Sequence, residues 1–200
     1  MQNLQFAYPE RQLFSKLTAS LPAGVNLIRG GDGRGKSTLL RLLAGVLHAD
    51  GGSMQINQTS LKEQPNAYRQ QVFWTEARSE NFDQLTPPAY FEMQRQRWPG
   101  FDSQRLGELI QGLDLEVHLH KQLFMLSTGS KRKVWLAGAF ASGAAVTLID
   151  EPFAALDAPS IRFVIQLLKD SAAQQQRVFV VADYEAPGDV PLAGLIDLGD

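Results

Sequence analysis

The chain has 200 residues, of which 44% are hydrophobic, enough for one domain with a proper core or one domain with an inserted lobe. Its 19 basic and 21 acidic side chains give a net charge of −2, which argues against nucleic-acid binding through bulk positive charge. The absence of cysteine excludes disulfides and thiolate metal sites, and no run of 18 apolar residues predicts a membrane-spanning helix.

The N-terminal part of the chain follows the pattern of β structure. Leu4, Phe6 and Tyr8 alternate with more polar neighbours, which predicts a half-buried strand. Residues 13–21 predict a second strand region, and the turn residues at 22–24 end it. We therefore expect β structure at the start of the chain.

A glycine-rich stretch at residues 30–38 contains the P-loop pattern G-x-x-x-x-G-K-[ST]. A β-forming run at 25–28 precedes it, and a helical pattern of apolar residues follows it to near His48. Backbone N–H groups of such a loop surround phosphate oxygens, and the helix start adds partial positive charge. We expect Lys36 to reach the β- and γ-phosphates and the Ser37 hydroxyl to ligate Mg²⁺. The other predicted nucleotide-binding residues are Gly30, Gly31, Asp32, Gly33, Arg34, Gly35 and Thr38.

The middle of the chain changes from strands to helices. Short strands are predicted at 54–57 and 71–75. Residues 85–140 carry prolines and amphipathic helical patterns, which predict a helical lobe inserted into an α/β core. Within it, Ser127 is expected to cap a helix that begins near Ser130.

Two apolar runs in the last third of the chain predict buried parallel strands. Residues 145–149 form the first run, which ends on Asp150 and Glu151, and residues 178–181 form the second. An amphipathic helix is predicted between them, and a short last strand at 195–198. Open α/β sheets place ligands at the carboxyl ends of their strands, so we expect the two carboxylates near bound phosphate.

These motifs, in this order, resemble those of the ATP-binding-cassette (ABC) transporter ATPases. The P-loop is followed by Leu126-Ser127-Thr128-Gly129-Ser130 and then by the strand that ends in Asp-Glu. Residues 126–157 are similar to the family's signature, Walker B and D-loop segments, and the compact size resembles bacterial single-cassette subunits, including the haem-exporter type. The resemblance implies an α/β fold over one domain, 1–200. Its P-loop NTPase core has a mainly parallel sheet, with an N-terminal antiparallel β part and an inserted helical lobe.

The resemblance also implies roles for individual side chains. Asp150 matches the Walker B aspartate, which holds Mg²⁺ through water beside Ser37. Glu151 matches the catalytic glutamate, which orients and polarises the attacking water, and Lys36 completes this catalytic pair. Asp157 matches the D-loop aspartate that touches the opposite subunit, although it could instead cap the helix that follows.

The signature turn departs from the usual Leu-Ser-Gly-Gly-Gln. Ser127 and Gly129 match the pattern, while Thr128 replaces the first glycine and Ser130 the glutamine. In the family this helix start faces the γ-phosphate bound by a second subunit, because a helix N-terminus attracts anions. The basic run at 131–133 is expected to be a solvated helix face rather than a nucleic-acid patch.

Tyr8 stands where the family has an aromatic residue that stacks on adenine. Its planar ring suits that contact. The alternative is that Tyr8 packs into the core with Leu4 and Phe6.

Two further departures concern the rate and coupling of hydrolysis rather than nucleotide binding. Where the family has a glutamine after the β part, the nearest residues here are Glu76 and Arg78. Where it has a switch histidine, the strand ends in Asp183 and Tyr184. An ionised aspartate would be repelled by a γ-phosphate, whereas a tyrosine hydroxyl can donate a hydrogen bond to it. We therefore predict that Tyr184 faces the phosphate and contributes to catalysis.

The resemblance implies an ATP-binding and ATP-hydrolysing subunit that energises a membrane transporter with ATP and Mg²⁺. The expected partners are a second, identical cassette and an integral membrane transporter subunit, with no nucleic acid. The expected location is cytoplasmic, at the inner face of the cell membrane. The alternatives are a degenerate cassette that binds ATP with little turnover, and a non-transport regulatory ABC ATPase.

The helical lobe contains five large apolar side chains within a dozen positions. They either line a groove for a cytoplasmic helix of the membrane partner or pack the lobe itself. These residues are Tyr90, Phe91, Met93, Trp98 and Phe101.

Overall fold

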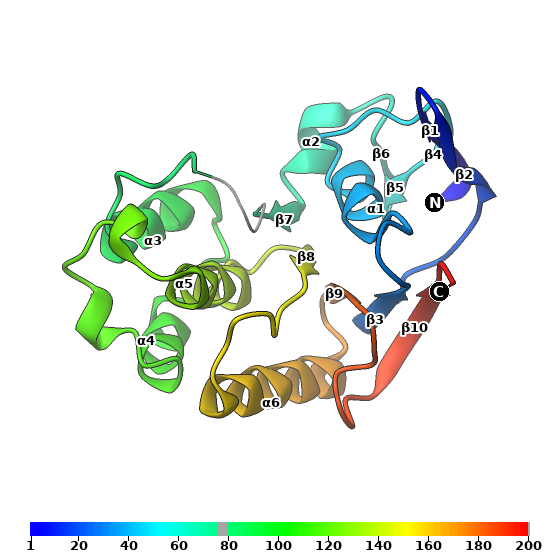
Figure 1. The fold of residues 1–200 in the computed structure, drawn as a ribbon. Helices are drawn as coiled ribbons and strands as arrows, with labels where there is room; N and C mark the ends of the chain where they lie inside the picture. The colour runs from blue at the N-terminus through cyan, green and yellow to red at the C-terminus, as the bar shows by residue number, and fades with distance from the viewer. Residues whose placement is uncertain (76–79, 200) are drawn as a thin grey trace.

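The computed structural model describes residues 1–75 and 80–199. A five-stranded parallel sheet with strand order β10-β3-β9-β8-β7 lies at its centre (Figure 1). The strands are β3 (Gly24–Arg29), β7 (Val72–Trp74), β8 (Val146–Asp150), β9 (Val178–Asp183) and β10 (Leu192–Asp197). The strands predicted from residues 71, 145 and 178 onward are confirmed to within one or two residues. Because the strands are parallel, their carboxyl ends meet at one edge of the sheet.

The N-terminal β part is antiparallel, as predicted. The strand β1 (Gln2–Tyr8) pairs with β2 (Arg11–Leu17) on one side and with β4 (Gly51–Ser53) on the other. A separate small hairpin is formed by β5 (Gln55–Ile56) and β6 (Thr59–Ser60). The strand that the sequence predicts over residues 13–21 is β2, which begins before residue 13 and ends well before residue 21.

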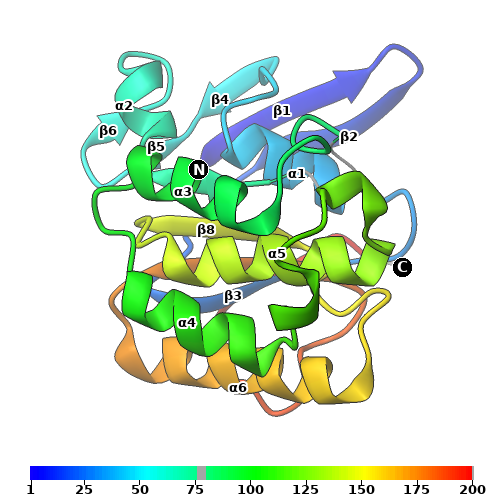
Figure 2. The same cartoon turned by 90° about the vertical axis from the view of Figure 1, so that its left-hand side faces the viewer.

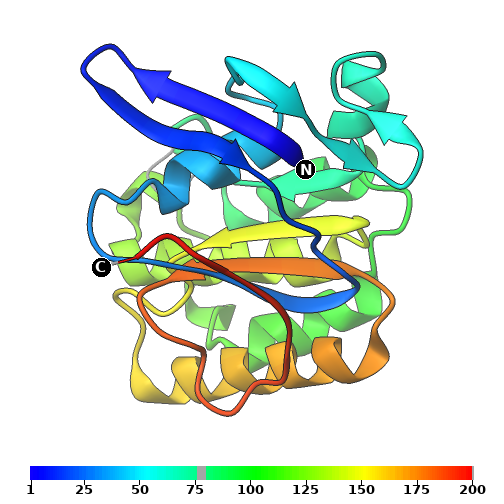
Figure 3. The same cartoon turned by 90° about the vertical axis from the view of Figure 1, so that its right-hand side faces the viewer.

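Helices cover both faces of the parallel sheet (Figure 3). On one face lies α1 (Lys36–Leu43), together with the N-terminal β part, and on the opposite face lies α6 (Ala158–Gln174). The prediction that the first helix continues to near His48 is wrong. Gly45 adopts a φ of 68°, and this left-handed conformation ends the helix. The short helix α2 (Pro65–Arg69) has no counterpart among the predicted elements.

Helical structure also fills much of the segment 85–140 (Figure 2). It contains α3 (Pro87–Arg97), α4 (Ser103–Gly112) and α5 (Thr128–Ala141), and two 3-10 turns, η1 (Glu116–His118) and η2 (Leu123–Met125). Both α3 and α4 pack against α5, which in turn packs against β8. The helix expected near Ser130 starts two residues earlier, with Ser127 as its N-cap.

The aromatic side chains of α3 and of its C-cap residue Trp98 are buried. Tyr90, Phe91 and Trp98 are 0, 3 and 4% exposed. The Tyr90 ring lies 4.7 Å from the ring of Trp135, edge to face. The prediction of a partner groove lined by these side chains is therefore wrong for these three, because burial leaves them no surface to offer. The alternative, that they pack the lobe, is confirmed for Tyr90 and Phe91, whereas Trp98 packs between the lobe and Phe73 of β7, with the two ring centroids 5.8 Å apart.

Alternate side chains of the sheet enter two separate cores, because neighbouring residues of a strand point to opposite faces. Val25 and Leu27 of β3 pack with the helices α5 and α6, whereas Ile28 packs with α1 and the N-terminal β part. Burial on both faces explains why these strands are mostly apolar, with Asn26 of β3 and Thr147 of β8 as buried polar exceptions. Among the residues that the structure describes, no helix has the length and apolar character needed to cross a membrane.

Candidate active site

The P-loop joins the end of β3 to the start of α1. Gly35 is the N-cap of α1, with a φ of 96°. A Cβ atom at this position would lie 3.1 Å from the ring of Phe14, so conformation and space both favour glycine. Because helical bonding begins here, the N–H groups of the first turn are left for an anion.

The side chain of Lys36 lies within the P-loop. Its Nζ donates to the carbonyl oxygens of Gly30 at 2.7 Å and Gly31 at 3.0 Å, and the residue is 6% exposed. Both acceptors are neutral, so these bonds leave the positive charge of the ammonium available to an anion. The loop opens into a P-loop cavity of about 280 Å³, lined by Tyr8, Arg11, Leu13, residues 31–38 and Glu151.

Tyr184 reaches the P-loop from the end of β9. Its ring centroid lies 4.0 Å from Lys36 Nζ, a cation–π contact, and its hydroxyl donates to Asp32 Oδ1. The hydrogen bond to this carboxylate raises the pKa of Tyr184 to about 12. Burial raises the pKa of the neighbouring Asp183, an effect that Glu151 strengthens and Lys36 opposes. The structure thus brings Tyr184 to the loop, and its contact with a phosphate stays a prediction.

Asp150 stands at the carboxyl end of β8. Its Oδ1 is buried and has no hydrogen-bond partner in residues 1–75 and 80–199. Burial raises the pKa of Asp150, and a hydrogen bond with Ser37 opposes that rise. A buried carboxylate oxygen without a donor needs a partner, and a carboxylate beside a hydroxyl is an oxygen donor set that suits a hard divalent cation.

Glu151 follows with an unusual backbone conformation, a φ of 45°. Its N–H donates to the Ala182 carbonyl at 2.9 Å, and its own carbonyl accepts from Arg132 Nη1. These bonds hold a left-handed conformation that is costly for a residue with a side chain. The resulting turn places Glu151 at the P-loop cavity.

Tyr8 lies at the same cavity rather than in the core. It is 42% exposed, and its hydroxyl lies 3.4 Å from Thr38 Oγ1. Its ring meets that of Phe6 edge to face at 5.0 Å. The alternative of a core tyrosine is therefore wrong, and stacking on adenine stays a prediction.

The signature turn packs directly against the loop that follows β8. Ser127 caps α5, because its Oγ accepts from the N–H of Ser130 at 3.1 Å. A Cβ atom at Gly129 would lie 2.2 Å from the carbonyl oxygen of Ala155, so only glycine fits. Residues 127–129 do not line the P-loop cavity of the same chain.

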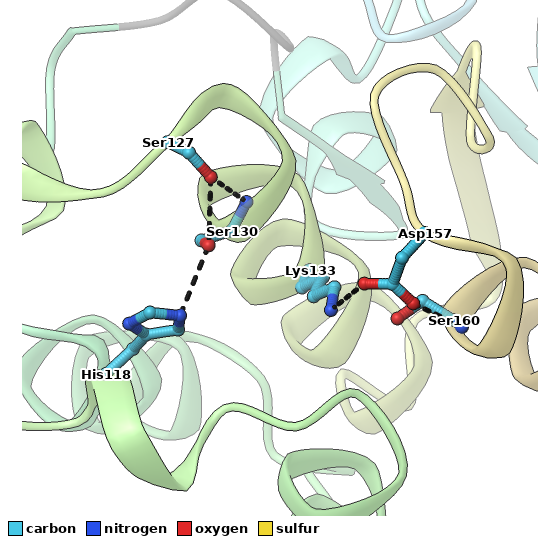
Figure 4. Close-up of polar contacts among 6 residues, drawn as sticks. All are labelled: His118, Ser127, Ser130, Lys133, Asp157 and Ser160. Carbon is cyan, nitrogen blue, oxygen red and sulfur yellow. Dashed lines mark hydrogen bonds and ion pairs between the residues drawn. The ribbon is translucent and has the colours of Figure 1, made fainter.

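Asp157 makes two contacts within its own chain (Figure 4). It caps α6 by accepting from the N–H of Ser160 at 2.9 Å, and it accepts from Lys133 Nζ at 2.6 Å. The bond with Lys133 is the main cause that lowers the pKa of this carboxyl. The capping role is confirmed, and contact with an opposite subunit stays a prediction.

The expectation that residues 131–133 form a solvated face is wrong. Lys131 pairs with Asp83 at 2.6 Å, and Lys133 is 9% exposed. Arg132 donates to the Glu151 carbonyl, as described above. The sequence pattern therefore does not reveal that these three residues bond α5 to neighbouring segments of the chain. The other two residues singled out in the sequence, Glu76 and Arg78, lie outside the described residues.

A parallel sheet that carries a P-loop at one strand end and, at another, an aspartate with a buried carboxylate oxygen defines a P-loop NTPase. The sequence profile of the ABC transporter family matches residues 15–154, so the chain belongs to this family.

Similar proteins and structures agree with this family. The cytochrome c biogenesis ATP-binding export protein CcmA of Legionella pneumophila is 30% identical over 92% of both chains. The ABC transporter ATP-binding protein YtrB of Bacillus subtilis is 26% identical over 92% of this chain and 62% of its own length. A solved ATP-binding subunit of an ABC transporter matches with a TM-score of 0.82 at 23% identity, over 92% of this chain and 78% of that one. A putative ABC transporter ATP-binding protein from Pyrococcus furiosus matches with a TM-score of 0.77 at 18% identity, over 98% of this chain and 95% of that one. The chain is thus an ATP-binding subunit of an ABC transporter, with ATPase activity.

Proposed function

We propose that this chain binds Mg²⁺-ATP in the P-loop cavity and hydrolyses it together with a second copy, driving an integral membrane transporter subunit at the inner face of the cell membrane. The observation that carries the proposal is the buried Oδ1 of Asp150, which has no hydrogen-bond partner among the described residues and lies at the strand edge beside Ser37. Asp150 and Ser37 would hold the Mg²⁺, which would neutralise phosphate charge.

The remaining roles follow from the geometry of the P-loop cavity. Lys36 attracts the β- and γ-phosphates, and the N–H groups at the start of α1 bind their oxygens. Glu151, at the rim of the same cavity, orients and polarises the attacking water. Tyr8 offers an exposed ring to the adenine.

The separation of the two motifs supports a composite site. Glu151 lines the P-loop cavity, but Ser127 and Gly129 do not. A second cassette would have to supply the signature turn, and a second copy of this chain carries one. The transport role is supported by the relatives, whose names describe an ATP-binding export protein and an ABC transporter ATP-binding protein.

Turnover per chain should rise with protein concentration, because a composite site exists only in the dimer. The measurement is the rate of phosphate release from ATP by the purified protein, from nanomolar to tens of micromolar chain, with Mg²⁺. With EDTA in place of Mg²⁺ the release should stop. A specific activity that is constant over this whole range would contradict self-pairing, and the absence of any release would contradict hydrolysis by this chain.

Tyr184→Phe should slow turnover at least tenfold, about 1.4 kcal/mol of transition-state stabilisation. The change removes the hydroxyl but keeps the ring, so the contact with Lys36 can persist. Steady-state kinetics against Asp183→Asn as the neighbouring control would test it. The prediction fails if the phenylalanine variant turns over ATP at the parent rate, or if Asp183→Asn shows the larger loss.

A further inference from the structure

A hydrogen-bonded group of three side chains joins the signature turn to the turn η1. We call Ser127, Ser130 and His118 the signature network (Figure 4). Ser127 Oγ donates to Ser130 Oγ at 3.0 Å, and Ser130 Oγ lies 3.3 Å from His118 Nε2. None of the roles proposed above involves His118, which comes from outside the signature turn.

Lys121 determines which ring nitrogen of His118 carries the proton. The Lys121 Nζ lies 3.4 Å from His118 Nδ1. An ammonium group has only donors, so Nδ1 must be the acceptor of this contact. A neutral imidazole has one N–H, which therefore belongs to Nε2. It follows that His118 donates to Ser130 Oγ rather than accepting from it.

The two donors together fix the hydroxyl proton of Ser130. A hydroxyl oxygen has two acceptor positions, and here Ser127 and His118 occupy both. The proton of Ser130 must then point away from both neighbours. The proton of Ser127 is directed at Ser130, so Ser130 holds the one network hydroxyl proton that has no acceptor among the described residues and can bond an anion.

We propose that His118 is a positioning residue that makes Ser130 the donating hydroxyl of the signature turn. Its acceptor is the terminal phosphate held by the partner cassette, so the inference rests on the composite site proposed above. Ser130 stands at the first turn of α5, where the helix start also favours an anion. Without the His118 donor, the Ser130 proton is no longer directed outward.

The charges around His118 are compatible with a neutral ring. Burial is the main cause that lowers its pKa, and Lys121 and Lys133 add to the effect. Asp114 opposes it, and His120 lowers it slightly. Protonation at low pH would add a proton at Nδ1 and break the Lys121 contact, but it would leave the Nε2 donor in place. The positioning role therefore predicts no separate acid limb from His118.

Two replacements of His118 that are isosteric with each other test the proposal. A glutamine can donate an amide N–H to Ser130 Oγ, whereas a glutamate can only accept and would capture the Ser130 proton. In the Glu151→Gln background, the readout is the dissociation constant of the ATP-induced dimer, measured by analytical ultracentrifugation. We expect His118→Glu to dimerise at least tenfold more weakly than His118→Gln, with thermal unfolding showing that both monomers are folded. His120→Glu, an exposed position nearby, controls for added charge.

Ser130→Ala separates the hydroxyl effect from plain repulsion. If Ser130 carries the effect, Ser130→Ala alone weakens the dimer, and the difference between the two His118 variants disappears in the Ser130→Ala background. The role of His118 would be overturned, with the composite site unaffected, if the difference between the two His118 variants persisted in the Ser130→Ala background. Equal dissociation constants for the two variants with Ser130 intact would overturn it as well. A Glu151→Gln parent that stays monomeric with ATP would overturn the composite site, and this inference with it.

Discussion

Lys36→Ala is expected to weaken ATP binding at least a hundredfold, about 2.7 kcal/mol. The Nζ of Lys36 is buried within the loop and bonded to the neutral carbonyls of Gly30 and Gly31. Triphosphate is strongly anionic, charge-assisted hydrogen bonds are stronger than neutral ones, and the low dielectric of a buried site strengthens them further. Isothermal titration with ATP and Mg²⁺ measures the change, and Lys62→Ala, at an exposed lysine, is the matched control.

Stability must be measured with the same variants, because Lys36 also bonds its own loop. Lys36→Met keeps most of the aliphatic stem and removes only the charge and the donors. It should therefore bind ATP as poorly as the alanine variant, with a melting temperature closer to that of the parent. Equal ATP affinity in the methionine variant and the parent would refute the P-loop assignment.

The parts of the fold that could be predicted have local causes. Residues 145–149 are apolar except for Thr147 because β8 is covered on both faces, and this pattern by itself indicates a buried strand. The P-loop could be recognised because the turn itself needs glycine where Gly35 adopts a positive φ. Ser127 as an N-cap follows from the same local logic.

The contacts that could not be predicted join residues far apart in the chain. Lys133 binds Asp157, 24 residues away, and Arg132 binds the Glu151 carbonyl, 19 residues away. The hydroxyl of Tyr184 reaches Asp32 across 152 residues. A local charge pattern carries no information about such partners. The basic run at residues 131–133 therefore has the same pattern as a solvated helix face. The burial of aromatic side chains in the helical segment could not be predicted either, because composition alone does not indicate which face of an aromatic-rich helix is covered.

Glu151→Gln is expected to reduce ATP turnover at least a hundredfold, about 2.7 kcal/mol of transition-state stabilisation, while ATP still binds. Glutamine keeps the shape of the side chain but can no longer accept the proton of the attacking water. The backbone bonds to Ala182 and Arg132 involve main-chain atoms of residue 151, so the turn should be preserved. Single-turnover phosphate release measures the loss, and Glu185→Gln, at an exposed position, is the control.

The same variant should also accumulate as an ATP-bound dimer. Hydrolysis is what would release the two chains, and the substitution removes a negative charge beside the bound triphosphate. Size-exclusion chromatography with ATP and Mg²⁺ should show the dimer for Glu151→Gln and its loss when Lys36→Ala is added, because the second change removes the nucleotide. Turnover within twofold of the parent would exclude Glu151 as the catalytic carboxylate. The variant could instead lose turnover, still bind ATP and remain monomeric. That result would leave Glu151 as the catalytic carboxylate but show that the signature turn of this chain pairs with a different cassette.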